Sequence, residues 1–299
     1  MDFRLKVFLT VAQRASFTKA AQELFISQPA VTKHIKELEE EYKIKFFDRT
    51  GNKVVLTTAG LVLESQVKKM FAIYRTIDFE LSALVGEQRG TLRLGASTTI
   101  AQYVIPPVLA KFHQISKEVK VVVKNDNTEQ IEKALVTREI DLGVVEGQSK
   151  NKAIQYIPFL EDELVLVCNA STVVPKEQIT LDQLVQLQFV TREVGSGTLE
   201  VIQYALKKVS INLSQLQIEM QLGSTESIKS YLMNSNCVAF LSINSIRKEL
   251  KNNELTIIKI ENFTIHRSFF LVSLQGQIDP LSTSFLRVMQ QYYKLDLKL

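Results

Sequence analysis

The sequence predicts an α/β protein in three parts: a helical N-terminal segment ending in a strand hairpin, a long connecting helix, and a larger part of alternating strands and helices. Three observations support this fold class. Apolar residues recur at helical spacing in the first forty residues, residues 59–88 contain no proline, and short apolar strands alternate with helices beyond Gly90. Because single domains usually have ~100–200 residues, a chain of 299 residues predicts more than one folded unit.

Composition and the first residues narrow the class of protein. Hydrophobic residues make up 45% and charged residues 23%, as in ordinary globular proteins. Charges interrupt the apolar stretch at 1–8, so no secretory signal is predicted, and no later run has the ~20 apolar residues of a membrane span. We therefore expect a cytoplasmic protein. The net charge of +4 is too small to indicate nucleic-acid binding by itself.

The two cysteines predict no special chemistry. Cys168 and Cys237 both lie in apolar, strand-like runs, without the spacing of a disulfide framework or a metal site. We expect ordinary buried thiols, no metal and no cofactor.

Two short helices are expected first. Phe3, Val7, Phe8 and Val11 share one face of a helix over 3–14. Ser16 then offers an N-cap for a second helix over 18–25.

A third helix begins at Gln28 and Pro29, where proline loses no hydrogen bond. Val31, Ile35 and Leu38 recur at positions i, i+4 and i+7 and form its inward face. The polar residues of the outward face are Gln28, Thr32, Lys33 and Lys36.

This arrangement is typical of a helix-turn-helix. A tight turn joins two short helices, Ala21 lies at their close contact, and Val31 follows ten positions later. The third helix would then enter the major groove of DNA. A plain three-helix core with a solvated polar face is the alternative.

A strand hairpin follows and favours the DNA-binding interpretation. Residues 45–57 predict two short strands around a Thr-Gly-Asn turn, with Arg49 and Lys53 near its tip. Such a wing places cations beside the phosphate backbone.

The chain is similar to the LysR-type transcriptional regulators through motifs at residues 16–21, 27–32, 35–39, 46–49 and 56–60. Weaker motifs at 92–97, 140–144 and 222–228 extend the resemblance over nearly the whole chain. The resemblance implies DNA contacts from Ser27, Gln28, Pro29, Thr32 and Lys33 on the recognition helix and from Asn52 and Lys53 on the wing. The helix face and the wing pattern add Lys36 and Arg49.

Residues 59–88 predict one long helix with a heptad seam. It would pair two copies into a homodimer that reads a pseudo-palindromic site on double-stranded DNA. The alternative packs the seam against the chain's own domain. The resemblance further implies tetramers in many family members, and contact with RNA polymerase stays open. The seam residues are Leu63, Val67, Met70, Tyr74, Ile77, Leu81 and Leu84.

The C-terminal part predicts a two-lobed α/β domain. Strands at 91–96, 119–124 and 140–145 alternate with helices at 105–114 and 128–137, which indicates a parallel sheet. A similar set follows: strands at 164–168, 189–191, 218–222 and 238–241, with helices at 199–209 and 226–234.

The resemblance implies a periplasmic-binding-protein-like effector domain, to whose first lobe the strand at 267–273 and the helix at 285–293 return. The expected domains are a winged helix-turn-helix at 1–58, a linker helix at 59–89 and an effector domain at 90–299. Lobe I would comprise 90–162 and 265–299, and lobe II 163–264.

Two polar loops follow strands of this domain, where ligands of parallel sheets gather. Ser97, Thr98 and Thr99 follow its first strand, and a loop at 191–198 follows a strand of the second lobe. Facing hydroxyls and helix-start amides favour a small carboxylate, phosphate or sulfate-bearing effector between the lobes. Helix capping alone, or a neutral effector, is the alternative. The effector residues expected in the second loop are Arg192, Ser196 and Thr198.

One segment departs from the family pattern. Asparagines and a serine at 234–236 replace a glycine-rich turn. Asparagine tolerates positive φ, so we expect the turn to persist there.

Other functions fit less well. His34, His113 and His266 have no neighbours typical of catalysis, and the carboxylates Asp141 and Glu146 flank a strand without a metal motif. A solute-binding protein would need an export signal and no residues 1–88. The sequence therefore predicts a DNA-binding transcriptional regulator, not an enzyme, that responds to a small-molecule effector.

Overall fold

A computed structural model describes residues 2–50, 53–85, 87–148, 150–172, 178–276 and 278–295. The side chains at 49, 50 and 53 lie outside this description, as does all of Asn52. The chain divides into two compact units, Met1–Asp78 and Phe79–Leu299. Among the described helices, none has the length and apolar character that would let it cross a membrane.

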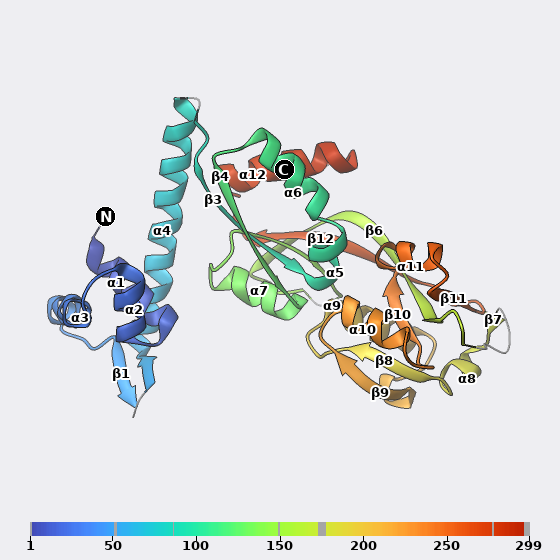
Figure 1. The fold of residues 1–299 in the computed structure, drawn as a ribbon. Coiled ribbons are helices and arrows are strands. Elements are labelled where there is room, and N and C mark those ends of the chain that lie inside the picture. Colours follow the sequence, from blue (N-terminus) through green and yellow to red (C-terminus); the bar gives the residue numbers. More distant parts are fainter. Residues whose placement is uncertain are drawn as a thin grey trace. The chain divides into compact units, whose positions relative to one another are not determined.

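The first unit contains three packed helices, α1 (Phe3–Arg14), α2 (Phe17–Leu24) and α3 (Gln28–Tyr42) (Figure 1). Ser16 caps α2 by accepting a hydrogen bond from the Lys19 amide, and Ser27 caps α3 through the Ala30 amide. The inward and outward faces that the sequence predicts for α3 are confirmed as buried and polar faces. The core of the unit comprises Val7, Phe8, Val11, Ala20, Ala21, Val31, Ile35, Leu38, Phe46, Phe47 and Val67.

The wing is an antiparallel hairpin of β1 (Phe47–Thr50) and β2 (Lys53–Leu56). A buried carboxylate holds its start against α3. Glu39 Oε1 accepts hydrogen bonds from the amides of Phe46 (2.9 Å) and Phe47 (3.4 Å), and Lys45 Nζ lies 2.9 Å from Oε2. The hairpin is therefore fixed to the helix that the sequence assigns to the DNA groove.

The long helix α4 (Thr58–Leu84) ends before the expected position near residue 88. Ser82 provides the physical reason. Its hydroxyl donates to the Phe79 carbonyl (2.8 Å) and accepts from the Arg89 amide (3.1 Å), while its carbonyl accepts from the Glu87 amide (3.0 Å). These bonds turn the chain out of the helix.

The heptad seam of α4 has two different surroundings. Val67 is buried in the core of the first unit, and Leu63 packs against that core, so the alternative of packing on the chain's own domain is correct for this end. The remaining seam residues are exposed apolar side chains: Met70, Tyr74, Ile77, Leu81 and Leu84.

The second unit is built on an eight-stranded mixed sheet. Parallel pairing joins β3 (Gly90–Ser97) to β4 (Val119–Asp126) and β5 (Leu142–Glu146), as the alternating pattern predicts. However, β12 (Ile265–Leu274) returns antiparallel to β5, so the sheet is not purely parallel. The strand order is β4-β3-β5-β12-β6-β11-β7, where β6 is Ile154–Asn169, β11 is Leu255–Ile260 and β7 is Gln178–Ile179, and β10 (Ala239–Ser242) pairs with β6.

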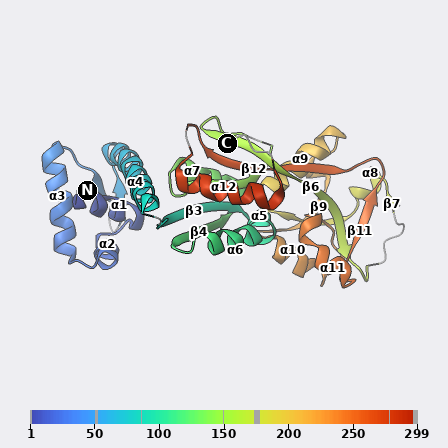
Figure 2. The same cartoon turned by 90° about the horizontal axis from the view of Figure 1, so that it is seen from above.

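Helices cover both faces of the first lobe (Figures 1 and 2). On one face α5 (Thr98–Tyr103), α6 (Pro106–Ile115) and α12 (Pro280–Tyr293) enclose the largest apolar cluster of the chain's described part. On the other face Ile131 and Leu135 of α7 (Thr128–Val136) pack against Val145 and Val272 of the sheet. The C-terminal strand and helix therefore complete the first lobe, as expected.

The second lobe surrounds the far end of β6 (Ile154–Asn169), which begins ten residues earlier than predicted and runs through both lobes. Figure 2 shows α9 (Gly197–Lys208) and α10 (Thr225–Leu232) on opposite sides of this lobe. Each of the two helices contributes to a separate apolar cluster. Its other elements are β7 (Gln178–Ile179), α8 (Leu181–Leu184), β8 (Gln188–Arg192), α9 (Gly197–Lys208), β9 (Gln217–Leu222), α10 (Thr225–Leu232), β10 (Ala239–Ser242), α11 (Arg247–Lys251) and β11 (Leu255–Ile260).

The turn at 234–236 forms without the expected use of positive φ. None of Asn234, Ser235 and Asn236 adopts it. Instead, Asn234 Nδ2 donates to the Ser230 carbonyl (2.9 Å) and closes the turn through its side chain.

Candidate DNA-binding and effector sites

The outward face of α3 is a continuous polar surface. Gln28, Pro29, Lys33 and Lys36 are exposed, and Thr32 is half-buried. Gln28 Nε2 donates to Thr32 Oγ1 at 2.9 Å, so the amide and the hydroxyl are held together before any ligand binds. This face borders a shallow hollow of about 650 Å³ lined by Gln28, Pro29, Thr32, Lys33, Lys36, Glu37 and Glu40.

The charges along this face are only loosely paired. Lys33 Nζ lies 3.9 Å from Glu37 Oε1, and both side chains are solvent-accessible. His34 packs edge-on against the Phe3 ring at 5.5 Å, and its Nδ1 lies 3.5 Å from Glu37 Oε2. Surface pairs of this kind contribute little, so Lys33 can exchange its partner for a phosphate at small cost.

The second unit brings the six predicted effector residues together where its two lobes meet. Ser97 ends β3, and Thr98 and Thr99 begin α5. Arg192 ends β8, Ser196 precedes α9, and Thr198 lies in the first turn of α9. All six are buried. Arg192 Nη2 donates to Thr98 Oγ1 across the junction at 3.1 Å, and Thr99 shares a 3.3 Å hydrogen bond with Thr225 of the second lobe.

Glu146 lies at the centre of this junction, although sequence patterns did not select it. The side chain ends β5 and is 1% exposed. Ser97 Oγ donates to Glu146 Oε2, and Thr198 Oγ1 donates to Oε1 at 3.0 Å. Because Ser97 belongs to the first lobe and Thr198 to the second, one carboxylate joins the two lobes.

A buried guanidinium continues the network. Arg267 on β12 donates to Thr198 Oγ1 (2.8 Å) and to Asp162 Oδ2 (2.8 Å), and its Nη1 lies 3.5 Å from Glu146 Oε1. Asp162 also accepts from Ser242 Oγ at 2.7 Å. Two carboxylates therefore share one guanidinium in a region almost without solvent.

Arg192 is also neutralised by a carboxylate. Its Nε and Nη2 donate to Glu193 at 2.8 and 2.9 Å. Burial acts to raise the pKa of Glu193, but hydrogen bonds from Arg192 and its charge outweigh burial, so the pKa lies below its usual value. The guanidinium that the sequence offers as a charge partner for the effector is thus already paired.

Two hydroxyls of the second loop have no partner. Thr191 Oγ1 and Ser196 Oγ are buried without a hydrogen bond. Ser196 precedes α9 and Ser97 precedes α5, yet neither side chain caps its helix. Capping alone therefore does not explain why serines occupy these two positions.

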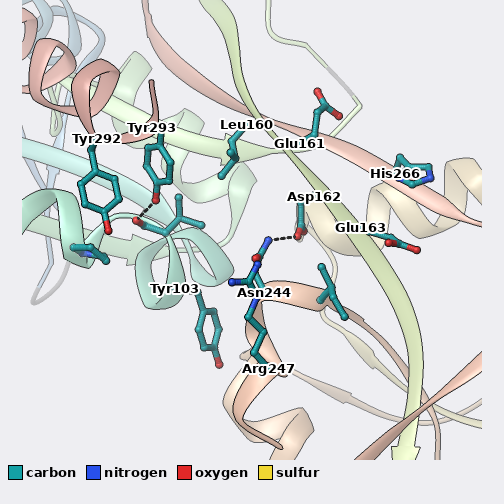
Figure 3. A pocket seen from close by; sticks show the side chains of 13 residues that line it. Tyr103, Leu160, Glu161, Asp162, Glu163, Asn244, Arg247, His266, Tyr292 and Tyr293 are labelled. Atoms are coloured by element: carbon teal, nitrogen blue, oxygen red, sulfur yellow. Dashed lines mark hydrogen bonds between the residues drawn. The ribbon is translucent and has the colours of Figure 1, made fainter. Parts of the chain in front are cut away.

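A separate pocket of about 610 Å³ lies beside β6, between α5, α11 and α12 (Figure 3). Asp162 lines it and accepts a 2.9 Å hydrogen bond from Asn244, while Tyr293 donates to the Val104 carbonyl at 2.7 Å. Since Asp162 also binds Arg267, this pocket and the lobe junction share a side chain.

The two cysteines are free, buried thiols, as expected. Burial raises the pKa of Cys168, and burial together with Glu219 raises that of Cys237 to about 11. Both therefore stay protonated at neutral pH.

The functional residues missed from the sequence are Glu146, Asp162 and Arg267. Each is a charged residue within a predicted or observed strand. Glu146 ends a run of apolar residues, whereas Asp162 lies between two glutamates and Arg267 lies between His266 and Ser268. A charge in an otherwise buried strand needs a partner. That signal marks Glu146 as unusual but does not identify the charges near it, because Asp162 and Arg267 lie 16 and 121 positions further along the chain (146 to 162 and 146 to 267). The polar neighbours of Asp162 and Arg267 give no such signal.

A winged helix-turn-helix joined to a two-lobed domain with a polar junction defines a class of protein: DNA-binding regulators that carry a ligand-binding domain. The chain belongs to the LysR family of transcriptional regulators. A family model described as "Bacterial regulatory helix-turn-helix protein, lysR family" matches residues 3–61, and one described as "LysR substrate binding domain" matches residues 86–294. The chain is thus a transcriptional regulator and not an enzyme.

Known proteins are similar over most of the chain. The HTH-type transcriptional regulator CysL of Bacillus subtilis (strain 168) is 31% identical over 88% of this chain and 87% of its own length. A probable RuBisCO transcriptional regulator of Thalassiosira pseudonana is 34% identical over 90% of both. The regulatory domain of CcmR from Synechocystis PCC6803, solved with 2-PG, is 29% identical, covers 68% of this chain and 97% of its own, and has a TM-score of 0.62.

Proposed function

We propose that this regulator binds promoter DNA as a homodimer and that an anionic effector at its lobe junction changes how it does so. The observation that supports DNA binding is that α3 has one buried apolar face and one exposed polar face. Val31, Ile35 and Leu38 bury one face of α3 in the core. The opposite, polar face is therefore available to enter the major groove. The proposed contacts are Ser27, Gln28, Pro29, Thr32, Lys33 and Lys36 on α3, with Arg49, Asn52 and Lys53 on the wing.

Removing two of these side chains should weaken promoter binding strongly. In the Gln28→Ala/Lys33→Ala variant, one amide and one cation are lost from the groove-facing surface. Each base contact contributes ~1–3 kcal/mol, so the loss of two should lower operator affinity by at least about one to two orders of magnitude. Fluorescence anisotropy with the intergenic DNA upstream of the chain's own gene measures this loss.

A matched control removes the same residue types from α1. Lys6 and Gln13 are exposed there, outside the proposed contact surface. Lys6→Ala/Gln13→Ala should bind the same DNA nearly as well as the wild type. Equal affinities for both double variants would show that α3 does not read the operator.

The exposed end of the α4 seam supports dimerisation. Tyr74, Ile77 and Leu81 are 40%, 42% and 58% exposed, and such an apolar row on one helix is typical of a coiled-coil surface. Ile77→Glu/Leu81→Glu should therefore abolish self-association, because burying two carboxylates in a seam is unfavourable. Light scattering should report the mass of one chain.

Ser65→Glu/Gln66→Glu serves as the control, since it adds the same charge at exposed positions outside the seam. This variant should keep the mass of the wild type. A dimer that survives Ile77→Glu/Leu81→Glu would exclude the α4 seam as the interface. Pairing of two dimers into a tetramer and contact with RNA polymerase remain part of the proposal, as does a cytoplasmic location.

For the effector, the junction supports an anionic ligand held by Ser97, Thr98, Thr99, Arg192, Ser196 and Thr198. The Ser196 hydroxyl is buried, has no partner and stands at the first turn of α9, where helix amides favour negative charge. CcmR, whose regulatory domain is 29% identical, binds 2-PG, which supports a small ligand for this domain too. We place the functional boundaries at 1–58, 59–89 and 90–299, with the lobes meeting near 162 and 265.

A further inference from the structure

Glu146 already holds the hydroxyls that an effector anion would use. Its two carboxylate oxygens accept from Ser97 and Thr198, both of which belong to the proposed effector site. Its carbonyl is also engaged, since it accepts from Thr128 Oγ1 at 2.8 Å. A carboxylate of the protein therefore stands where the negative group of a ligand would be.

The surrounding cluster has no spare positive charge for a second anion. Arg267 is shared by Glu146 and Asp162, and Arg192 is paired with Glu193. Three carboxylates thus face two guanidinium groups. An anion that entered beside Glu146 would add negative charge to a poorly solvated region, which is strongly unfavourable. Such an anion has to replace Glu146 and cannot join it.

We infer that Glu146 is an internal competitor of the effector, and that the site therefore selects a tetrahedral oxyanion, such as a phosphate or sulfate group, over a simple carboxylate. This inference rests on the proposed effector site at the lobe junction.

The selectivity follows from the exchange of one anion for another. A free carboxylate would bind the same two hydroxyls that Glu146 already holds, so it would gain no contact. It would also compete with a tethered side chain whose effective concentration is millimolar or higher, so Glu146 would win. A tetrahedral oxyanion brings more acceptor oxygens. After taking the hydroxyls of Ser97 and Thr198, it can accept from Ser196 and from the first amides of α9, donors that Glu146 leaves unused.

The exchange also changes the connection between the lobes. Glu146 belongs to β5 and Thr198 to α9, so the present connection is made within the chain. A free oxyanion would replace this tether with a ligand that contacts both lobes. Occupancy would thereby bias the closure of the domain.

Calorimetric titration of the full chain with sulfate and phosphate, and with acetate and formate, at constant ionic strength tests the inference. The wild type should bind the oxyanions and neither carboxylate. Glu146→Gln keeps the shape and removes the charge, so oxyanion affinity should rise at least about tenfold. Glu146→Asp, which withdraws the carboxylate by one methylene, should give a smaller rise.

Two further variants report on the site itself. Glu146→Ala leaves Ser97, Thr198 and Arg267 around a space of carboxylate size, so acetate or formate should now raise its melting temperature but not that of the wild type. Ser196→Ala removes a hydroxyl that has no partner, so it should lower oxyanion affinity without lowering stability. Glu161→Gln is the charge control, because this exposed carboxylate also accepts a serine hydroxyl, from Ser268 at 2.7 Å.

The outcomes separate the inference from the proposed function. Equal oxyanion affinity in the wild type, Glu146→Gln and Glu161→Gln, with a loss in Ser196→Ala, would retain the anion site and overturn the competition. Loss of oxyanion binding in Glu146→Gln would make Glu146 part of recognition and overturn it as well. Binding unaffected by Ser196→Ala, or no binding in any folded variant, would remove the proposed site and the inference together.

Discussion

Arg267→Leu should destabilise the second unit by about 3–5 kcal/mol, the range for removing one partner of a buried ion pair. The substitution leaves the carboxylates of Glu146 and Asp162 buried without their shared cation. Hydrogen bonds from Ser97 and Ser242 persist, but hydroxyl groups do not compensate a full negative charge. Urea unfolding of the full chain, followed by circular dichroism, measures the change.

The control is an ion pair on the surface. Lys124 Nζ lies 3.0 Å from Glu139 Oε2, and both side chains are well exposed. Lys124→Ala should therefore change stability by no more than about 1 kcal/mol. If Arg267→Leu were as mild as Lys124→Ala, the Arg267 cluster would not stabilise the junction.

Gly197→Ala should destabilise the same unit by ~1–3 kcal/mol, although helix propensity alone predicts the opposite sign. Gly197 is the first residue of α9, where alanine is ordinarily better than glycine. Here a Cβ would lie 1.9 Å from the Glu146 carbonyl oxygen and 2.6 Å from Thr128 Oγ1. Either α9 or β5 has to move, so the two lobes cannot keep their present contact.

Gly223→Ala provides the comparison for this effect, because no heavy atom beyond its chain neighbours lies within 4 Å of its added Cβ. It should alter the unfolding midpoint only slightly, whereas Gly197→Ala should lower it clearly. A stabilised Gly197→Ala protein would show that α9 and β5 can move apart without a loss of stability. Thermal denaturation of the two variants beside the wild type makes this comparison.

Local sequence determined the helices and the polar loops of this protein. The i, i+4, i+7 spacing of Val31, Ile35 and Leu38 specifies which side of α3 is buried, because periodicity acts within a few residues. Ser16 and Ser27 specify helix starts for the same reason. The hydroxyls of Ser97 and Thr198 were also identifiable, since each follows a strand and lies at or near a helix start.

Tertiary structure decided which charges meet these hydroxyls. Glu146, Asp162 and Arg267 lie on three strands that become neighbours in the order β5-β12-β6, through pairings between residues more than a hundred positions apart. Alternation along one strand cannot reveal the partner of a buried charge when both faces of the sheet are covered. The same limit applies to α4: its spacing predicts an apolar seam, but contact with the core buries Val67, and the bonds of Ser82 end the helix at Leu84.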